Sequence, residues 1–242
     1  DNGRSWTQCC VAGGLLVAAN AYMEAKAPNG IRYVPHLSFF GSSVSIEGKY
    51  IAVGAWGYSA AGWQNGAVFI FTLNEDTANT TCPEWICWDM LLGPAIPYCP
   101  ETCPPDVTTT LQNSSKFGFS VSIGSNGLLA VGAYKVNAGS RYDSGAVYVY
   151  CPEPLELDEN NTSDCLIWKP TSGTRENPTS LNYDNRRNYD YFGFSVSVFV
   201  KDASTASIYD DEKANKDDCI RTPPTTPLGC WVVVGAPNRS QC

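Results

Sequence analysis

The sequence predicts an all-β protein made of repeated four-stranded antiparallel sheets, and two observations support this fold class. One is a phrase that recurs in the same order: Phe-Gly, then serines alternating with large apolar residues, then an apolar stretch that ends in Gly-Ala. The other is the alternation itself, because a period of two residues is typical of β-strands. A phrase repeated at this scale indicates one supersecondary unit copied in series.

The first strand of each unit follows the Phe-Gly pair. In the middle copy, large side chains alternate with glycine and serine from Phe117 to Ile123. Such a strand has one bulky face and one nearly bare face, and the bare face lets another sheet approach closely. The pairs themselves are Phe40-Gly41, Phe117-Gly118 and Phe192-Gly193.

Three further strands complete each predicted unit. The second strand, as at 128–133, is continuously apolar, which is typical of a strand covered on both faces. Its Gly-Ala end predicts a point where a side chain would obstruct a close backbone approach. Third strands are expected at 66–71 and 145–150, and outer fourth strands at 85–92 and 165–169.

A weaker copy precedes these units, with strands expected at 9–13, 16–20 and 30–34. No segment has a convincing period of 3.6 residues, so no helix is expected. The predicted units are therefore 1–38, 39–116, 117–191 and 192–242, the first degenerate and the last unfinished.

These phrases resemble FG-GAP repeats. Phe-Gly stands at 40–41, 117–118 and 192–193, and Gly-Ala-Pro at 235–237, with Gly-Ala-Trp at 54–56 and Gly-Ala-Tyr at 132–134 as relaxed forms. The resemblance implies that each repeat is a four-stranded blade of a β-propeller, typically seven-bladed, as in the heads of integrin α subunits. About four blades would then be visible here. The resemblance also implies a function in extracellular adhesion and assembly, which is usual for the family.

The resemblance also bears on metals. Many integrin-type repeats carry an Asp-rich calcium loop, in which alternating carboxylates converge on one cation. The corresponding segments here, 46–49 and 123–127, lack several carboxylates, so no calcium and no other cofactor is expected. The acidic insertion 201–218 is interrupted by lysines and is interpreted as a solvated loop.

The chain contains 11 cysteines, a high count that favours disulfides over reduced thiols. A zinc site is less favoured, because only one histidine is present. The spacing suggests four candidate pairs: Cys82 with Cys87, Cys99 with Cys103, Cys151 with Cys165, and Cys219 with Cys230. An odd count leaves one thiol over, and Cys242 is expected to pair beyond the segment or with another chain.

Glycosylation sequons lie between or beside the repeated strands, where N-glycans would not disturb packing. Together with the cysteines they favour a secreted or cell-surface protein. The candidate acceptors are Asn79, Asn113, Asn160, Asn161 and Asn238.

Charge and composition exclude other classes. A net charge of -8 argues against nucleic-acid binding, which needs a basic surface. No apolar run reaches the roughly 18 residues of a membrane span. The single histidine, His36, lies in a connector, and no GxSxG elbow occurs, so no catalytic residue and no enzymatic activity are expected.

The favoured interpretation is a structural or adhesive glycoprotein that is secreted or on the cell surface. It includes a subunit of an extracellular fibre or coat. Its expected partners are further copies of itself or further blades of a longer chain, since four units cannot close a seven-bladed ring and an open sheet edge invites pairing.

The alternative is a receptor head that binds a protein or glycan through loop aromatics, because aromatic side chains dominate binding hot spots. A more remote alternative is the accessory domain of a secreted hydrolase. The candidate contact residues are Trp56, Tyr58, Trp63, Tyr134 and Tyr142.

Overall fold

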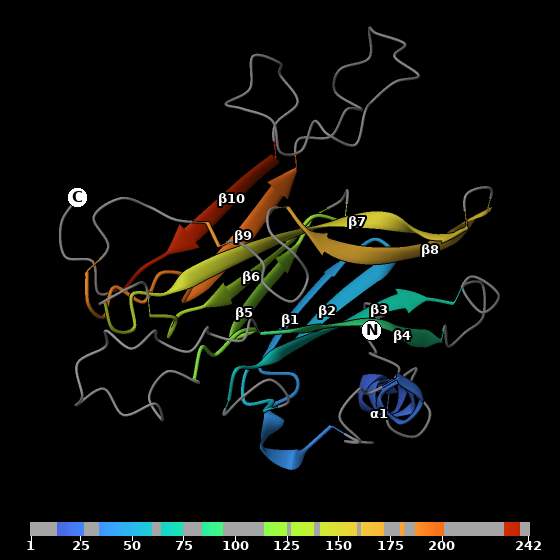
Figure 1. Ribbon diagram of the computed structural model, residues 1–242, viewed down its shortest axis with the longest axis horizontal. Coiled ribbons are helices and arrows are strands. Elements are labelled where there is room, and N and C mark those ends of the chain that lie inside the picture. Colours follow the sequence, from blue (N-terminus) through green and yellow to red (C-terminus); the bar gives the residue numbers. More distant parts are fainter. Residues whose placement is uncertain are drawn as a thin grey trace, which may run out of the picture.

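The computed structural model describes residues 14–26, 34–59, 64–74, 84–93, 114–124, 127–137, 141–158, 161–171, 180–181, 187–200 and 230–237. Within them the chain forms two four-stranded antiparallel sheets and one two-stranded sheet. Figure 1 shows the three sheets following one another in space in chain order, with one helix beside the first. The predicted all-β fold of four-stranded blades is thereby confirmed.

Blade 1 contains β1 (Ser43–Glu47), β2 (Tyr50–Ala55), β3 (Ala67–Leu73) and β4 (Trp85–Leu92) in sequential order. The outer strand β4 lies where the sequence predicted a fourth strand. Blade 2 repeats the order with β5 (Ser120–Ile123), β6 (Leu129–Ala133), β7 (Ala146–Asp158) and β8 (Asn161–Pro170). Here β7 and β8 run further than the sequence predicted.

The third sheet is a hairpin of β9 (Ser195–Val200) and β10 (Cys230–Gly235), called the third hairpin below. The register of the first two strands is the same in all three sheets, because Ser43 pairs with Gly54, Ser120 with Gly132, and Ser195 with Gly235. Residues at matching positions of the phrase therefore have the same local geometry.

The strand expected at 16–20 is wrong, and so is the expectation of no helix. Residues Gly14–Lys26 form the helix α1, which packs against β4. The segment is rich in leucine and alanine, which favour helices. Ala19 and Met23, four residues apart, are buried against blade 1. Of the other predicted strands in this unit, 9–13 and 30–33 lie outside the described residues, and Val34 is not in a strand.

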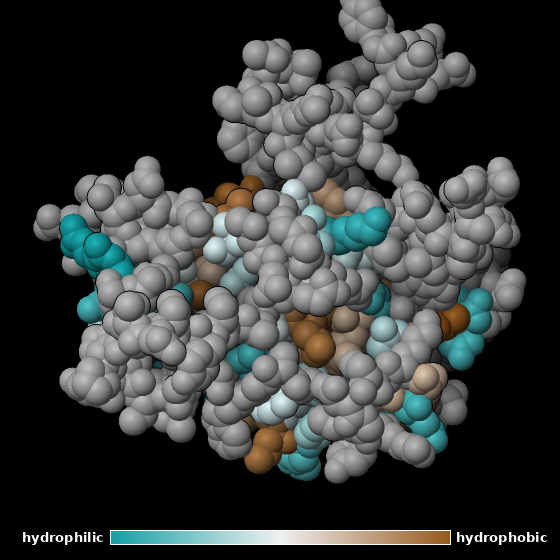
Figure 2. Space-filling view, in the orientation of Figure 1, coloured by the Kyte–Doolittle hydropathy of each residue, from teal (hydrophilic) through white to brown (hydrophobic). Residues whose placement is uncertain are grey.

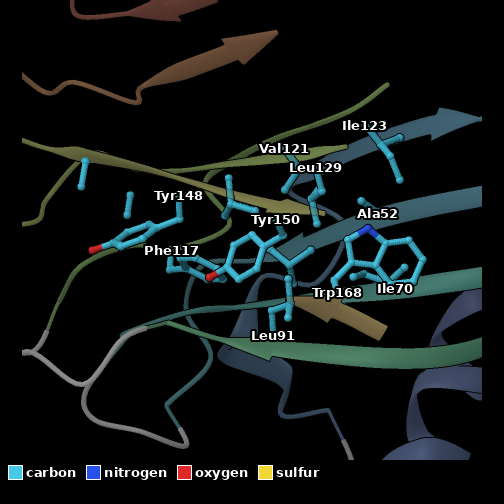
Figure 3. Close-up of a cluster of buried hydrophobic side chains, with 14 of the residues drawn as sticks. Ala52, Ile70, Leu91, Phe117, Val121, Ile123, Leu129, Tyr148, Tyr150 and Trp168 are labelled. Carbon is cyan, nitrogen blue, oxygen red and sulfur yellow. The ribbon is translucent and has the colours of Figure 1, made fainter. Parts of the chain in front are cut away.

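The main core lies between blade 1 and blade 2. Ala52, Val68 and Ile70 of blade 1 pack against the bulky face of β5, where Val121 and Ile123 are 8% and 5% exposed. Figure 3 shows Phe117 beside Tyr148 and Tyr150, and Trp168 beside Ala52 and Ile70. The bulky face of one blade is thus buried by the blade before it.

The small residues of the phrase allow this close approach. A Cβ atom on Gly54 would lie 2.0 Å from the carbonyl oxygen of Gly118, and one on Gly132 would lie 2.0 Å from that of Gly193. The Ser43 hydroxyl donates to the Gly118 carbonyl at 2.8 Å. Each first strand therefore bonds to the Phe-Gly turn of the next sheet.

Two further contacts tie neighbouring sheets together. Next to the Phe-Gly pair, Gly66 and Phe117 form a parallel bridge, and Gly145 and Phe192 form its equivalent. At the outer edge, the buried carboxylate of Asp89 accepts the Trp168 backbone N–H at 3.2 Å. The repeated phrase therefore specifies the contacts between sheets as well as the strands.

In the part of the chain that the structure describes, no helix is long and apolar enough to span a membrane. On the face displayed in Figure 2, hydrophobic surface from these residues forms small separate patches.

Candidate functional site

One side of the described structure carries a row of aromatic side chains that crosses all three sheets. Its members come from three positions of the repeated phrase: the residue before Phe-Gly, the residue after it, and the residue after Gly-Ala. We call this set the aromatic row; it comprises Phe39, Trp56, Phe119, Tyr134, Tyr191 and Phe194, with Lys116 among them.

The Phe-Gly turn brings the first two positions together. The backbone N–H of Phe119 donates to the Lys116 carbonyl at 3.0 Å, and Phe194 donates to Tyr191 at 3.0 Å in the same way. Phe117 of the middle pair is fully buried, and the flanking residues differ in exposure. Phe39 and Phe194 are exposed, Phe119 and Tyr191 are half-buried, and Lys116 is only 8% exposed.

Ring contacts join the row within and between blades. Phe39 stacks on Trp56 with centroids 4.1 Å apart, and Phe119 lies 4.4 Å from Tyr134. Between sheets, Trp56 and Phe119 are 6.5 Å apart, and Tyr134 and Phe194 are 5.4 Å apart. Aromatic pairs at these separations attract one another, so the rings support each other's positions.

Lys116 is the charged member of the row. Its Nζ lies 4.0 Å from the centroid of the Trp56 ring, which is a cation–π geometry, and it also donates to Gln64 Oε1. Burial, and then the nearby positive charge of Lys135, lower the pKa of Lys116 to about 8. This amine can therefore change its charge at mildly alkaline pH.

A second lysine borders the row and is held differently. Lys135 lies 3.5 Å from the Asp143 carboxylate and 6.0 Å from the Tyr134 ring centroid. Burial raises the pKa of Tyr134, so its phenol keeps its proton in neutral solution. The row thus combines neutral rings with the Lys116 amine, and the Lys135 ammonium group lies at its border.

Exposure shows which rings a partner could touch. Phe39 and Phe194 are 44% and 41% exposed, and Tyr189, which contacts Tyr191, is 51% exposed. Trp56, Phe119 and Tyr134 between them are half-buried. Large rings that are packed on one side and open on the other fit a binding surface better than a core.

The five predicted contact residues have different outcomes. Trp56 and Tyr134 lie in the aromatic row. Tyr142 is 39% exposed and lies outside the ring contacts of the row, with its backbone N–H bonded to Asn188. Trp63 lies outside the described residues.

Tyr58 does not fit the prediction, because it is only 2% exposed. Its ring packs edge-on against Phe69 and its hydroxyl lies 3.8 Å from the Met23 sulfur, so it belongs to the core beneath α1. The helix that buries it was not expected from the sequence.

Sequence reasoning missed Phe39, Lys116, Phe119, Tyr191 and Phe194. A usable signal was present, since each of these residues flanks a Phe-Gly pair. The alternation placed Phe119 on the bulky face of a strand, whereas the strand itself begins at Ser120.

The predicted cysteine pairs are only partly described. Cys87 is a buried thiol in β4 whose pKa is raised by burial and by Asp89, and its predicted partner Cys82 lies outside the described residues. Cys99, Cys103 and Cys219 also lie outside them, as does the side chain of Cys230, so these pairings stay predictions.

The Cys151–Cys165 pair does not fit the register of β7 and β8. Cys151 stands opposite Lys169, and Cys165 is four residues further along β8. That offset is about 13 Å at the rise of a strand, well beyond the Cα separation that a disulfide spans. Cys165 lies in β8, where the sequence predicted an outer strand, and Cys151 lies in β7 just beyond the predicted third strand.

The predicted glycan acceptors are mostly outside the described residues, as Asn79, Asn113, Asn160 and Asn238 are. Asn161 begins β8 and pairs with Asp158 at the tip of the β7–β8 hairpin. The described part of the chain contains no cluster of three or more His, Cys, Asp or Glu residues that could hold a metal ion. His36 lies in the short 3₁₀ helix η1 (His36–Ser38).

Comparison with known proteins gives one family. The FG-GAP repeat family matches residues 38–71 and 112–150. These ranges contain β1, β2 and most of β3 in blade 1, and β5, β6 and the beginning of β7 in blade 2. No curated protein matches the chain. The repeated phrase, the four-stranded sheets and this match agree: the chain carries FG-GAP repeats, and they fold as blades of the β-propeller type.

Proposed function

We propose that this chain is a non-enzymatic adhesive module of the cell surface or of secreted material, and that it binds an extracellular protein or glycan through the aromatic row. FG-GAP repeats occur in extracellular and cell-surface proteins, which supports the location. The sequons and the high cysteine content support it as well.

The aromatic row is the observation that carries the proposal. Its rings come from three sheets, yet they form one continuous series of contacts with open faces at Phe39 and Phe194. Rigid aromatic side chains supply large contact areas at little entropic cost. Because the row is extended, it fits a protein surface or a glycan chain better than an isolated small molecule.

Lys116 lies just beneath this surface and is 8% exposed, so its positive charge would act on a partner without direct contact. A positive charge near a binding surface favours partners that carry acidic groups, such as sulfated or uronic glycans or acidic peptide segments. Since the pKa of Lys116 is about 8, the attraction should weaken as the pH rises above that value. This pH dependence distinguishes the effect of the Lys116 charge from that of the overall charge of the protein.

The test screens the full chain on a glycan array and against a displayed peptide library, and follows every hit by tryptophan fluorescence titration. Phe119→Ala is expected to weaken binding to a true ligand by about tenfold or more, because hot-spot truncations cost at least ~1–2 kcal/mol. The matched control is Ile86→Ala, which removes an exposed apolar side chain from the outer strand β4.

A hit that binds the wild type, Phe119→Ala and Ile86→Ala equally would refute the aromatic row as the binding surface. Enzymatic turnover of a bound glycan or peptide by the purified chain would refute the non-enzymatic role. For the location, we expect a glycosidase-sensitive mass shift when the chain is made in a secretory cell, and its absence would count against a glycoprotein.

A further inference from the structure

The structure leaves two sheet faces exposed that match, position by position, faces buried elsewhere in the molecule. We infer that these faces bind each other between copies: β1 of one copy docks on the third hairpin of another and continues the stack of blades head to tail. This inference does not rest on the proposed function.

The first face, called the β1 face, is the bulky side of β1. Val44 and Ile46 are 56% and 60% exposed there. Their equivalents Val121 and Ile123 in β5 are almost fully buried, because β5 packs on β1 and β2 of the blade before it. Val44 and Ile46 therefore lack the neighbouring sheet that buries the equivalent side chains in blade 2.

Helix α1 does not supply that cover. It packs on the same side of blade 1, through Ala19 and Met23, but it reaches the outer strand β4. The inner strand β1 is therefore the part of this face that is open. This strand is also the one needed for docking, because contacts between successive sheets involve mainly the first strand of the later sheet.

The second face, called the β9–β10 face, is the outer side of the third hairpin. Phe199 and Val233 are 61% and 65% exposed on it, and Ser195 and Ser197 are exposed as well. The opposite side of the hairpin is packed against blade 2 through Val196, Val198, Val232 and Val234. The hairpin thus has one covered face and one face in the position of the serine face of blades 1 and 2.

Hydrogen bonds of the two existing interfaces define how the β9–β10 face would be used. The Ser120 hydroxyl donates to the Gly193 carbonyl at 2.9 Å, as Ser43 does to Gly118. The backbone N–H of Val198 donates to Ser122 Oγ at 2.9 Å, as Ile123 does to Ser45. By register, Ser195 would donate to Gly41 of the second copy.

The same register assigns the second hydrogen bond, in which Ser197 would accept from the N–H of Ile46 of the second copy. Gly41 and Ile46 are both exposed in the structure. The β1 face therefore carries the acceptor and the donor that the two serines require.

Gly235 supports the same arrangement. At Gly54 and Gly132 a Cβ atom would collide with a carbonyl oxygen of the next sheet, 2.0 Å away. At Gly235 the nearest atom is the Ser195 Oγ at 2.2 Å, which belongs to the same hairpin and can rotate away. A glycine here leaves room for an incoming carbonyl such as that of Gly41 in a second copy.

One position departs from the pattern. Val233 stands where Ala52 and Ala130 stand in blades 1 and 2, so it brings additional methyl groups to the face. Val233→Ala restores the smaller residue, and we expect it to leave self-association unchanged or stronger. Val233→Lys places a charge in the contact, and we expect it to abolish self-association.

The experiment is sedimentation velocity on the full chain over a concentration series. A head-to-tail contact is heterologous, so wild type should grow past the dimer as concentration rises. Ile46→Lys blocks the β1 face and Val233→Lys blocks the β9–β10 face, and each variant alone should stay monomeric. An equimolar mixture of the two should form a dimer and stop, because one intact β1 face meets one intact β9–β10 face.

A subtler variant tests the hydrogen bond itself. Ser195→Ala should weaken self-association about tenfold, the usual effect of one lost hydrogen bond. The control is Leu37→Lys, which introduces the same charge at a residue that is 71% exposed outside both faces. All the substituted side chains in this series are surface-exposed, so circular dichroism and thermal unfolding should match wild type.

Three results would each overturn the inference. Wild type that stays monomeric at every concentration would assign these faces to other parts of a longer chain. Blocked variants that associate as well as the Leu37→Lys control would place the contact elsewhere. A mixture of the two blocked variants that remains monomeric would exclude a head-to-tail contact.

Discussion

Val44 and Ile46 in blade 1 and Val121 and Ile123 in blade 2 occupy the same positions of the repeat but have opposite environments. The first pair is more than half exposed, and the second is at most 8% exposed. The strands that hold them have the same register with their neighbours, so the local fold is not the cause. The difference is that β5 packs on blade 1, whereas no described sheet packs on the same face of β1. A first strand is therefore buried mainly by the blade that precedes it.

The largest expected effect tests this view at the phenylalanine of the Phe-Gly pair. Phe117 is fully buried between blade 1 and blade 2, whereas Phe40, at the same position of blade 1, is half-buried. Phe117→Ala should lower the free energy of unfolding by about 3–5 kcal/mol through the lost burial and the cavity left behind. Phe40→Ala should cost clearly less.

Urea denaturation of both variants, followed by circular dichroism, measures the difference. Equal losses would mean that Phe40 is held as tightly in blade 1 as Phe117 is in blade 2. The preceding blade would then contribute little to the stability of this ring.

A second, smaller effect concerns the glycine of Gly-Ala. Gly132→Ala places a Cβ atom against the Gly193 carbonyl and should destabilise the protein by about 1–3 kcal/mol, as overpacking does. Gly235→Ala meets only the Ser195 hydroxyl, so the monomer should change by no more than ~0.5 kcal/mol. Thermal unfolding in dilute solution separates the two, and a large loss in Gly235→Ala would show that this face is already occupied within one molecule.

A third expected effect involves charge at a position where the repeats differ. Phe39, Lys116 and Tyr191 all precede Phe-Gly, and of the three Lys116 carries the positive charge. Its pKa is about 8 when folded and about 10.4 in an unfolded chain. Between these values the unfolded chain binds more protons, so the contribution of Lys116 to stability should rise with pH across this window.

The measurement is the urea midpoint of wild type and Lys116→Met at several pH values from 7 to 10.5, a window set by the two pKa values. The difference between the two proteins isolates this group from other titrations. Trp56 fluorescence should change near pH 8 in wild type alone, because deprotonation removes the cation above its ring. A pH-independent difference would show that the Lys116 pKa is not lowered.

Much of the fold was predictable because it depends on local pattern. The alternation after each Phe-Gly pair predicted β1, β5 and β9, and the apolar stretches ending in Gly-Ala predicted β2, β6 and β10. Even the close approach at Gly54 and Gly132 could be anticipated, since only a packing reason explains glycine at the end of an apolar strand.

The helix and most of the site were not predictable for a physical reason. Leu16 and Val17 of α1 are exposed while Ala19 and Met23 are buried, so apolar residues surround the helix and no clear period marks it. The aromatic row depends on which side chains meet across two sheets, and a residue such as Lys116 gives no sign of that in its own segment. Only Trp56 and Tyr134 were found, because they are aromatic residues just beyond a strand.

The backbone conformation of the row has a consequence for the balance between stability and function. Phe39, Lys116 and Tyr191 have φ angles of 54°, 57° and 53°, in the left-handed region where bulky residues are strained. Each costs roughly 1–2 kcal/mol relative to an unstrained backbone, a cost that glycine would largely avoid. Large side chains at all three positions show that these turns tolerate conformational strain. Such strain is typical of segments whose side chains serve a function.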